Sequence, residues 1–552
     1  MTNRLRAIAL LAGACISICG CSSGQLTSKP KLAKDQTLRV VIDDQPASLD
    51  PGQSQYPYET AVLRAITEPL LRPSADLMGV TPAAASSYDI NLGGTIYTFH
   101  LRKTAKYWDG VPVKAADFVY AWRRLIDPRQ AAPSGVFFAD AVQNGSTVFS
   151  YNPQLDADKI DPGLKTLGLK AVDDLTFQVT LSGSDPAILW LAALPAGAPI
   201  REDVVTKYTD AKWATAPESL ITNGPFRVSS IVSKDHTTVV PNPAYWGSRP
   251  TLTSIEYRVI GDGAAALAAY KSGQVDEVDV QLTQAQAVGA DAQLNKELVK
   301  NSALTVWWLA FGLTVAPFAN NSKLRLAFTQ AIDRDAFVRE VFLGQGAPAT
   351  TFLPKGMRGY SPSLTSQHFD ATQARASLAA SGVTAAQLSG LKFTFDSTST
   401  FGPATAKFIA AQLKANLGVD IAADGVDAGT FQSRLDQSSF QFAGPVGWFA
   451  DFPDGSDWYD IFRSSDINNF DRYSSTRYDQ FVKAADGDNT PSRRDQEYGQ
   501  AEQLLIGDAP VAFLAQTVNW FLVRSYVRGL QTTPLDVWPG DGSPEKIYLS
   551  PH

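Results

Sequence analysis

Apolar and polar residues follow two different periods along the chain, and the two kinds of segment alternate. Residues 97–102 (YTFHLR) and 175–181 (LTFQVTL) alternate apolar and polar positions one by one, which predicts half-buried strands. Between them, residues 117–126 (DFVYAWRRLI) place apolar side chains three and four apart, which predicts a helix that Asp117 caps and Asp127-Pro128 ends. The apolar face of this helix comprises Phe118, Val119, Trp122, Leu125 and Ile126.

The same alternation continues in the second half of the chain. Asp370 opens a helix that runs through Ala380 and ends at Gly382, and a helix over 404–417 stops at Gly418 and leads into a short strand over 419–421. Strands that alternate with helices, beside separate antiparallel pieces, predict an α/β fold. With 552 residues, the chain is too long for one hydrophobic core, so we expect two or three lobes.

The first residues are typical of an export signal. Arg4 and Arg6 precede an apolar run over 7–17, which is shorter than the roughly 20 residues that a membrane-spanning helix needs. The run ends in ICGC, which resembles the lipobox of bacterial lipoproteins and predicts that residues 1–20 are removed and that Cys21 is lipidated. An ordinary cleaved signal peptide is the alternative, and either one implies export. Residues 21–36 are polar and rich in turn formers, as in a tether.

Charge and cysteine content narrow the class of protein. All three cysteines lie in the leader, so the mature chain contains no disulfide. Removal of residues 1–20 takes away two positive charges and changes the formal net charge from −7 to −9. A mildly acidic chain without basic runs argues against nucleic acid as a partner.

The usual motifs of catalysis and cofactor binding do not occur. The four histidines are scattered, no His/Cys spacing suits zinc, and there is neither a P-loop nor a G-x-S-x-G serine motif. The acidic run after Asp451 has Pro453 where a calcium loop needs an oxygen ligand. A carboxylate pair could still serve a glycosidase, but nothing in the sequence selects a pair among 55 acidic residues. We therefore expect no metal, no cofactor and no catalytic residue.

One stretch, 447–460 (GWFADFPDGSDWYD), places Asp451 between aromatic residues just after an apolar run. A carboxylate in such surroundings is unfavourable to bury unless a positive group meets it. That group could be a structural arginine, a metal ion, a proton in a reaction or the charged end of a ligand. The residues alone leave these alternatives open.

A series of short motifs in a fixed order carries a resemblance to a known family. The chain resembles the extracytoplasmic solute-binding proteins of peptide ABC transporters (family 5), and within them the oligopeptide-binding branch. The motifs are SLDP (48–51), WDG (108–110), ADFVYAWRRL (116–125), NGPF (223–226), NPAYW (242–246), YKSG (270–273), AIDR (331–334), WFAD (448–451), AEQLL (501–505) and DAPV (508–511).

The resemblance implies a periplasmic-binding-protein-like fold with two lobes around a hinged cleft and an extra insert lobe. Lobe I would be discontinuous, built from residues 37–67, 201–303 and 521–552. The insert, lobe II, would span 68–200, and lobe III would span 304–520. Two hinge strands would let the lobes close on a ligand and exclude water from the cleft.

The resemblance also implies the binding residues. Asp451 would receive the α-ammonium of a bound peptide, and Trp448 would form a wall of a side-chain pocket. The peptide backbone would pair with residues of both lobes: Gly447, Trp448 and Phe449 on one, and Gln55, Tyr56 and Pro57 on the other. Such backbone pairing does not depend on the side chains of the peptide. The alternative interpretations are a capping or ion-paired carboxylate for Asp451 and a core aromatic for Trp448.

The sequence departs from the family pattern in two places. Pro445 stands where the oligopeptide branch has a basic residue near the ligand's far end, and Arg434 could replace it or be a solvated helix charge. Residues 512–517 (AFLAQT) lack the consecutive aromatics of many relatives. Both departures leave ligand length and side-chain preference open.

The expected function is a lipid-anchored, monomeric receptor on the outer face of the cytoplasmic membrane. It would capture short peptides and deliver them to an ABC permease, whose separate ATPase subunits supply the energy. The alternatives are a binder of another solute, such as a sugar or a chelated metal, a peptide-sensing receptor, and an exported hydrolase, for which the sequence displays no paired acid and base.

Overall fold

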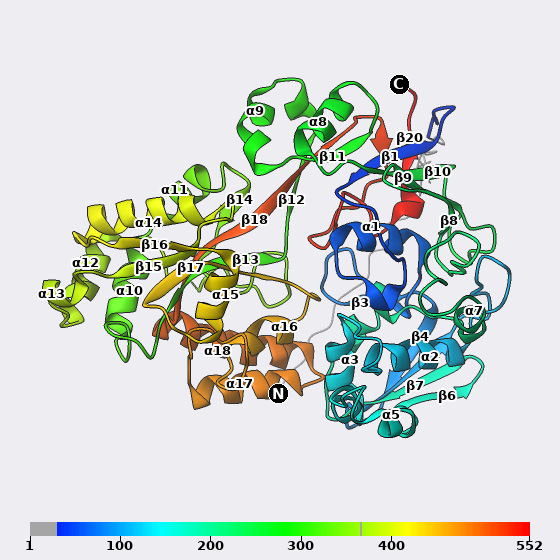
Figure 1. Cartoon of the computed structure of the whole chain (residues 1–552), viewed down its shortest axis with the longest axis horizontal. Helices are drawn as coiled ribbons and strands as arrows, with labels where there is room; N and C mark the ends of the chain where they lie inside the picture. Colours follow the sequence, from blue (N-terminus) through cyan, green and yellow to red (C-terminus); the bar gives the residue numbers. More distant parts are fainter. Residues whose placement is uncertain (1–29, 365–366) are drawn as a thin grey trace, which may run out of the picture.

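A computed structural model describes residues 30–364 and 367–552, which form one large sheet, one four-stranded sheet, two two-stranded sheets and the helices around them (Figure 1). The large sheet has the order β16-β15-β17-β13-β18-β11-β1-β10-β9-β8, and β12 and β14 pair with β18. Its strands are β1 (Thr37–Ile42), β8 (Phe226–Val232), β9 (His236–Pro241), β10 (Ser254–Val259), β11 (Glu277–Asp279), β12 (Leu298–Ser302), β13 (Thr305–Phe311), β14 (Gly346–Pro348), β15 (Lys392–Asp396), β16 (Ala422–Val426), β17 (Phe442–Phe449) and β18 (Val511–Val523).

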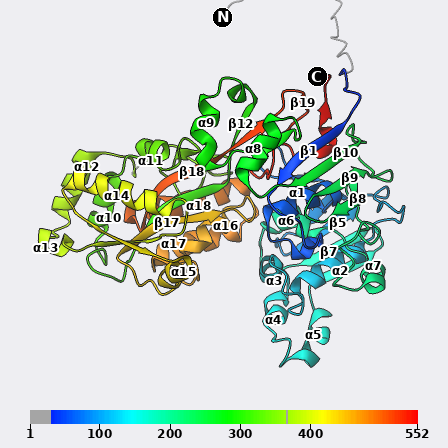
Figure 2. The same ribbon diagram turned by 45° about the horizontal axis from the view of Figure 1, so that its top comes forward.

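Strand β18 divides this sheet into two regions, because its two halves have different partners. Its first half pairs with β13 and β14, and its second half pairs with β11 and β12. We call β1, β8–β12 and the second half of β18 the first sheet region, and β13–β17 with the first half of β18 the second sheet region. The chain also passes from one region to the other between β12 and β13, so two neighbouring segments connect them (Figure 2).

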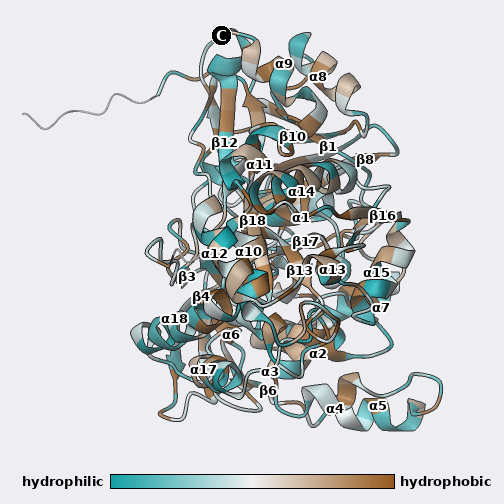
Figure 3. Cartoon of the chain, turned by 90° about the vertical axis from the view of Figure 1, so that its left-hand side faces the viewer, coloured by the Kyte–Doolittle hydropathy of each residue, from teal (hydrophilic) through white to brown (hydrophobic). Residues whose placement is uncertain are grey.

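Helices cover both faces of the second sheet region. Side chains of β13 alternate between them: Val306 and Trp308 pack toward α16 (Ser456–Tyr459), α17 (Thr476–Asp486) and α18 (Pro491–Asp508), and Leu309 and Phe311 pack toward the opposite side. The opposite face carries α10 (Ser322–Gln330), α11 (Arg334–Glu340), α12 (Ala371–Ala380) and α14 (Gly402–Leu417). The outer faces of α17 and α18 are mainly hydrophilic (Figure 3).

Two predicted helices of this part are confirmed, and one predicted strand is wrong. Asp370 caps α12 by accepting the N–H groups of Thr372 and Gln373, and Gly418 ends α14 with φ +71°. The strand expected over 419–421 begins only at Ala422. The chain is still turning at Val419, whose N–H bonds to the Leu413 carbonyl and whose buried side chain packs against α14.

The small sheet has the antiparallel order β4-β5-β7-β6, with β4 (Ala85–Ile90), β5 (Ile96–Leu101), β6 (Leu169–Asp173) and β7 (Thr176–Thr180). Helix α2 (Ala115–Ile126) packs on it through Phe118 and Trp122, whose rings lie 5.8 and 5.3 Å from that of Phe177. The predicted strands and helix are thus confirmed. Asp117 stands one turn inside the helix and accepts the Lys114 N–H at 2.9 Å.

The remaining elements are short. The strands are β2 (Leu71–Pro73), β3 (Val80–Pro82), β19 (Val527–Arg528) and β20 (Tyr548–Leu549). The helices are α1 (Pro57–Ile66), α3 (Gly135–Ala141), α4 (Gly145–Phe149), α5 (Ala157–Leu164), α6 (Ile188–Leu191), α7 (Glu202–Tyr208), α8 (Gly263–Lys271), α9 (Ala285–Ala290), α13 (Ala385–Leu388) and α15 (Ala428–Asp436).

The hydrophobic clusters group these parts into two bodies. One continuous cluster joins most of the first sheet region, α1 and the small sheet, whereas the second sheet region has its own clusters on its two faces. The two bodies also contact each other at places other than the two segments that connect them. Leu77, in the β2–β3 turn, is fully buried in a cluster of the second sheet region, and Phe452 packs edge-on against Phe137 at 5.6 Å.

The leader with Cys21 lies outside the described residues. Within 30–364 and 367–552, no helix is long and apolar enough to cross a membrane.

Candidate binding cleft

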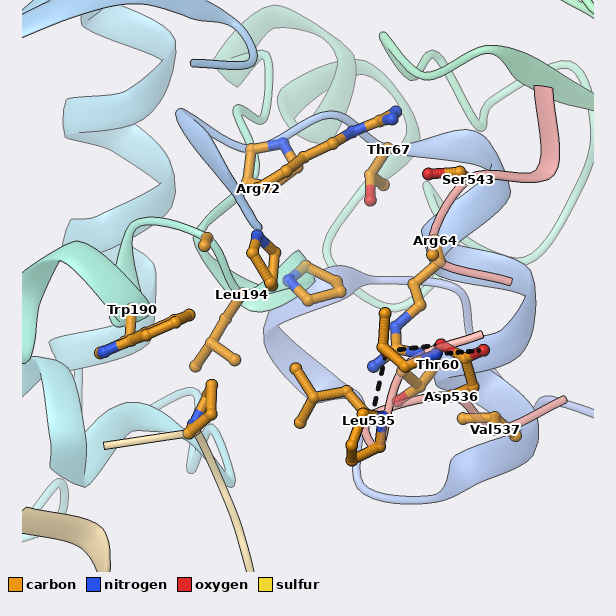
Figure 4. Close-up of a pocket in the computed structure, with 18 of the residues that line it drawn as sticks. Thr60, Arg64, Thr67, Arg72, Trp190, Leu194, Leu535, Asp536, Val537 and Ser543 are labelled. Carbon is orange, nitrogen blue, oxygen red and sulfur yellow. Dashed lines mark hydrogen bonds between the residues drawn. The ribbon is translucent and has the colours of Figure 1, made fainter. Parts of the chain in front are cut away.

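A cleft of about 1120 Å³ lies between the two bodies. Helix α1, the β2–β3 hairpin and the segments 190–196 and 531–546 form one wall, and Phe449, Asp451 and Pro453 lie on the other (Figure 4). The crossing segments contribute Thr305, Thr517 and Asn519. Strand β18 is buried at both ends and half-exposed at 517–519, where it passes the cleft. A change in the angle between the bodies therefore changes the width of the cleft.

Five of the predicted binding residues line this cleft: Gln55, Tyr56, Pro57, Phe449 and Asp451. The backbone at Gln55 and Tyr56, however, is not the strand-like edge that the sequence analysis expects. It is the start of α1, and the N–H groups of both residues donate to one carboxylate oxygen of Glu59, at 2.7 and 3.0 Å. These donors are therefore already in use, and a ligand can meet the two residues only through their side chains or the Gln55 carbonyl.

Gly447 and Trp448 are not among the residues that line the cleft. A Cβ at Gly447 would lie 2.8 Å from the Trp307 ring, which covers this residue, and Trp448 packs half-buried against the cluster around α16–α18. The strand that carries them has one open edge in the described structure. Residues 446–449 of β17 pair with β13 on one side, and on the other side β15 reaches only Phe442 and Ala443.

Asp451 follows this open edge and is paired with a second carboxyl group. The backbone N–H of Asp451 donates to an oxygen of Asp457 at 3.1 Å, and the side chain of Asp451 is hydrogen-bonded to the same group. Asp457 is buried and Asp451 opens into the cleft. No ion pair in the described structure involves either residue, whereas the neighbouring Asp454 forms a two-fold hydrogen-bonded pair with Arg494 at 2.6 and 2.7 Å.

Burial sets the protonation of this pair. It raises the pKa of Asp457 well above its usual value, and the charge of Asp451 raises it further. The Asp451 side chain has exposed surface, but the cleft walls restrict the water around it, and this desolvation raises its pKa too. Asp457 is therefore the member of the pair that holds its proton more tightly, so the negative charge of the pair lies on Asp451, and no cation of the described residues forms an ion pair with it. The alternative of an ion-paired Asp451 finds no partner in the described residues.

The structure also bears on Arg434 and on the possibility of a metal site. Arg434 lies 2.5 Å from Asp424 and does not line the cleft, so it does not replace the basic residue missing at Pro445. No group of three or more His, Cys, Asp or Glu side chains that could hold a metal ion occurs in the described part of the chain.

Asp457 and three cleft-facing residues near α1, Thr60, Arg64 and Thr67, were not predicted from the sequence. The three continue from Pro57 along one face of the helix, at spacings of three and four residues. This helical period was a usable signal, since the opposite face of α1 is apolar. No sequence signal distinguishes Asp457 from the other acidic residues nearby.

A cleft between two bodies, joined by crossing strands and lined by a carboxylate that forms no ion pair within the described residues, is typical of a hinged ligand-binding protein. The family model for bacterial extracellular solute-binding proteins, family 5, matches residues 79–470. The periplasmic oligopeptide-binding protein OppA of Salmonella typhimurium is 30% identical over 97% of this chain and 98% of its own. The probable deoxycholate-binding periplasmic protein YgiS of Escherichia coli is 28% identical over 90% and 91%.

Among solved structures, the unliganded open form of the periplasmic murein tripeptide-binding protein MppA superimposes with a TM-score of 0.82, at 27% identity over 95% of this chain and 99% of that one. The chain belongs to the family 5 bacterial extracellular solute-binding proteins. Members of this family are transport binding proteins and not enzymes.

Proposed function

We propose that this protein is a lipid-anchored extracytoplasmic receptor that binds short peptides by their free amino terminus and delivers them to an ABC permease. Asp451 carries the proposal, because it is a carboxylate that forms no ion pair within the described residues and lies beside an open strand edge. A peptide ammonium would form a charge-assisted hydrogen bond with Asp451. The peptide backbone would pair with residues 447–449, on the open edge of β17, independently of its side chains. The name of the OppA relative supports this ligand class.

We further propose the division into lobes. The first sheet region would be lobe I (37–67, 201–303 and 521–552), with 68–200 as lobe II and 304–520 as lobe III. The shared cluster supports lobes I and II moving as one unit against lobe III. The protein would act as a monomer, and its anchor would be a lipid on Cys21. Growth with a labelled fatty acid tests the anchor: Cys21→Ser should lose the label, and retention of the label would contradict lipidation.

The first experiment identifies the ligand without assuming it. The chain beginning at residue 22 is purified, and its native mass is measured before and after mild denaturation. A heterogeneous set of peptides a few residues long supports the proposal. A single non-peptide mass would overturn it, and a bile-acid mass would instead favour the ligand class that the name of the YgiS relative gives.

A matched pair of variants tests the role of Asp451. Asp451→Asn removes the charge that meets the ammonium, so we expect binding of a free-amine tetrapeptide to weaken by a hundredfold or more. Asp457→Asn is the control: Asp457 is the member of the pair that holds its proton more tightly, and an amide oxygen still accepts the Asp451 N–H. Its affinity should stay within about threefold of wild type. Calorimetric titration with free and N-acetylated peptide measures both, and equal affinity of Asp451→Asn and wild type would refute the assignment.

A further inference from the structure

Three cations line the cleft: Arg64, Arg72 and Lys546. Arg72 contacts Glu68 at 2.7 Å through Nε and Nη2 and Glu545 at 3.0 Å through Nη1. Lys546 donates to the side chain of Gln531 at 2.6 Å. Each nitrogen of the Arg72 guanidinium thus already contacts a carboxylate, and this side chain is part of the wall.

Arg64 differs from both. It stands in the middle of the cleft-facing stripe of α1, between Thr60 and Thr67 (Figure 4). Its Nη1 contacts both oxygens of Asp541, at 2.8 and 2.9 Å, and Asp541 is fully buried. Nε and Nη2 form no hydrogen bond within the described residues. The side chain is 20% exposed, so these two donors remain accessible from the cleft.

Neighbouring acceptors do not satisfy these donors. The Asp536 carboxylate, which also lines the cleft, already accepts the N–H and hydroxyl of Thr533 and the N–H of Gly540. In an open cleft, water can accept hydrogen bonds from Nε and Nη2. When the bodies close and exclude water, two unpaired guanidinium donors become unfavourable unless the ligand brings an acceptor.

We propose that Arg64 is a ligand-binding residue whose Nε and Nη2 donate to a backbone oxygen of the bound peptide, with Asp541 positioning the guanidinium. This inference rests on the proposed function and adds to it a second polar contact on the wall opposite Asp451. The oxygen belongs either to an internal carbonyl or to the terminal carboxylate. Both present acceptors to the planar fork of an arginine, which a lysine cannot reproduce.

The charge around Arg64 agrees with this role. The groups that face it are the carboxyls of Asp541 and Asp536. Burial raises the pKa of Asp541 to about 7, and Arg64 acts in the opposite direction. The pair with Asp541 engages only Nη1, so Nε and Nη2 keep their attraction for an oxygen.

The test compares Arg64→Gln with Lys546→Gln, which removes the same charge from the same cleft. Calorimetric titration uses one tetrapeptide in three forms: free at both ends, amidated at the carboxyl end, and acetylated at the amino end. We expect Arg64→Gln to weaken binding of the unmodified peptide by ten- to a hundredfold and Lys546→Gln by less than threefold. Unchanged affinity in Arg64→Gln, or an equal loss in both variants, would overturn the inference.

The modified peptides identify the oxygen and separate this inference from the proposed function. If the oxygen is the terminal carboxylate, wild type prefers the free acid over the amide and Arg64→Gln abolishes that preference. If it is an internal carbonyl, wild type binds both alike and the variant weakens both equally. Failure of wild type to distinguish the acetylated peptide would refute the ammonium site and leave Arg64 to be judged separately.

Arg64→Gln leaves Asp541 without its cation, so folding is checked by circular dichroism. Arg64→Lys is the second variant, because lysine keeps a charge beside Asp541 but loses the fork. It should weaken binding at least fivefold with an unchanged melting temperature, and full affinity in this variant would also overturn the inference.

Discussion

The contact between the small sheet and the second sheet region offers a quantitative test of the electrostatics. Asn489 bridges the two bodies: its Nδ2 donates to the Ser184 hydroxyl at 2.7 Å, and its Oδ1 accepts from the Tyr97 hydroxyl at 2.9 Å. Asp185 lies beside this bridge. It faces Asp454, Arg494 and Asp460 of the other body.

Desolvation raises the pKa of Asp185 from 3.8 to about 6. The Ala187 N–H and Arg494 act against this shift, and the charges of Asp454 and Asp460 add to it. Because the folded state holds this proton more tightly than the unfolded chain, ionisation of Asp185 opposes folding. The loss of stability develops as pH rises from 3.8 to about 6 and is complete above it. From the two pKa values it amounts to at most about 3 kcal/mol.

Asp185→Asn removes the charge and keeps an oxygen for the Ala187 N–H. We expect the variant to be more stable than wild type at pH 7 by about 1–3 kcal/mol, and to match wild type near pH 4. Urea unfolding across this pH range measures the difference. Asp173→Asn is the control of opposite sign: hydrogen bonds from Leu175 and Thr176 lower the pKa of that exposed carboxyl, so its removal should destabilise at pH 7. A stability difference for Asp185→Asn that does not change with pH would refute the reasoning.

Three further outcomes follow from packing and charge. Leu77→Ala should lower the free energy of unfolding by about 2–5 kcal/mol, because Leu77 is fully buried, whereas the exposed neighbour Met78→Ala should change it little in the same urea titration. Arg334→Met should lower the free energy of unfolding by about 3 kcal/mol or more, because the buried guanidinium donates to four backbone carbonyls, including that of Phe513. A decrease of less than about 1 kcal/mol, measured by urea unfolding, would contradict this. The affinity for a free-amine peptide should fall on acidification already above pH 3.8, the ordinary pKa of an aspartate, because the pKa of Asp451 is raised. Titration calorimetry between about pH 7 and 4 measures this, and an affinity that stayed constant over the whole range would contradict it.

Local pattern in the sequence was sufficient for many of the elements. The helices over 117–126, 370–380 and 404–417 and the strands over 97–102 and 175–181 form where the pattern predicts them, because each combines a clear period with its own end signal: a capping aspartate, a proline or a glycine. The strand expected over 419–421 failed because Val419 is used in packing against α14 before the chain enters the sheet.

The sequence by itself also determined the family, because the ordered motifs that carry the resemblance can be read without knowledge of the tertiary structure. It also predicted Asp451 as a binding residue. Only the tertiary structure decided which residues meet at the cleft. It turned Gln55 and Tyr56 into a helix start, covered Gly447 with Trp307, and buried Asp457 behind Asp451. It also left Arg64 with two free donors by placing Asp541 behind it, 477 residues further along the chain. Such pairings depend on how distant segments fold together, and the local sequence of neither partner contains that information.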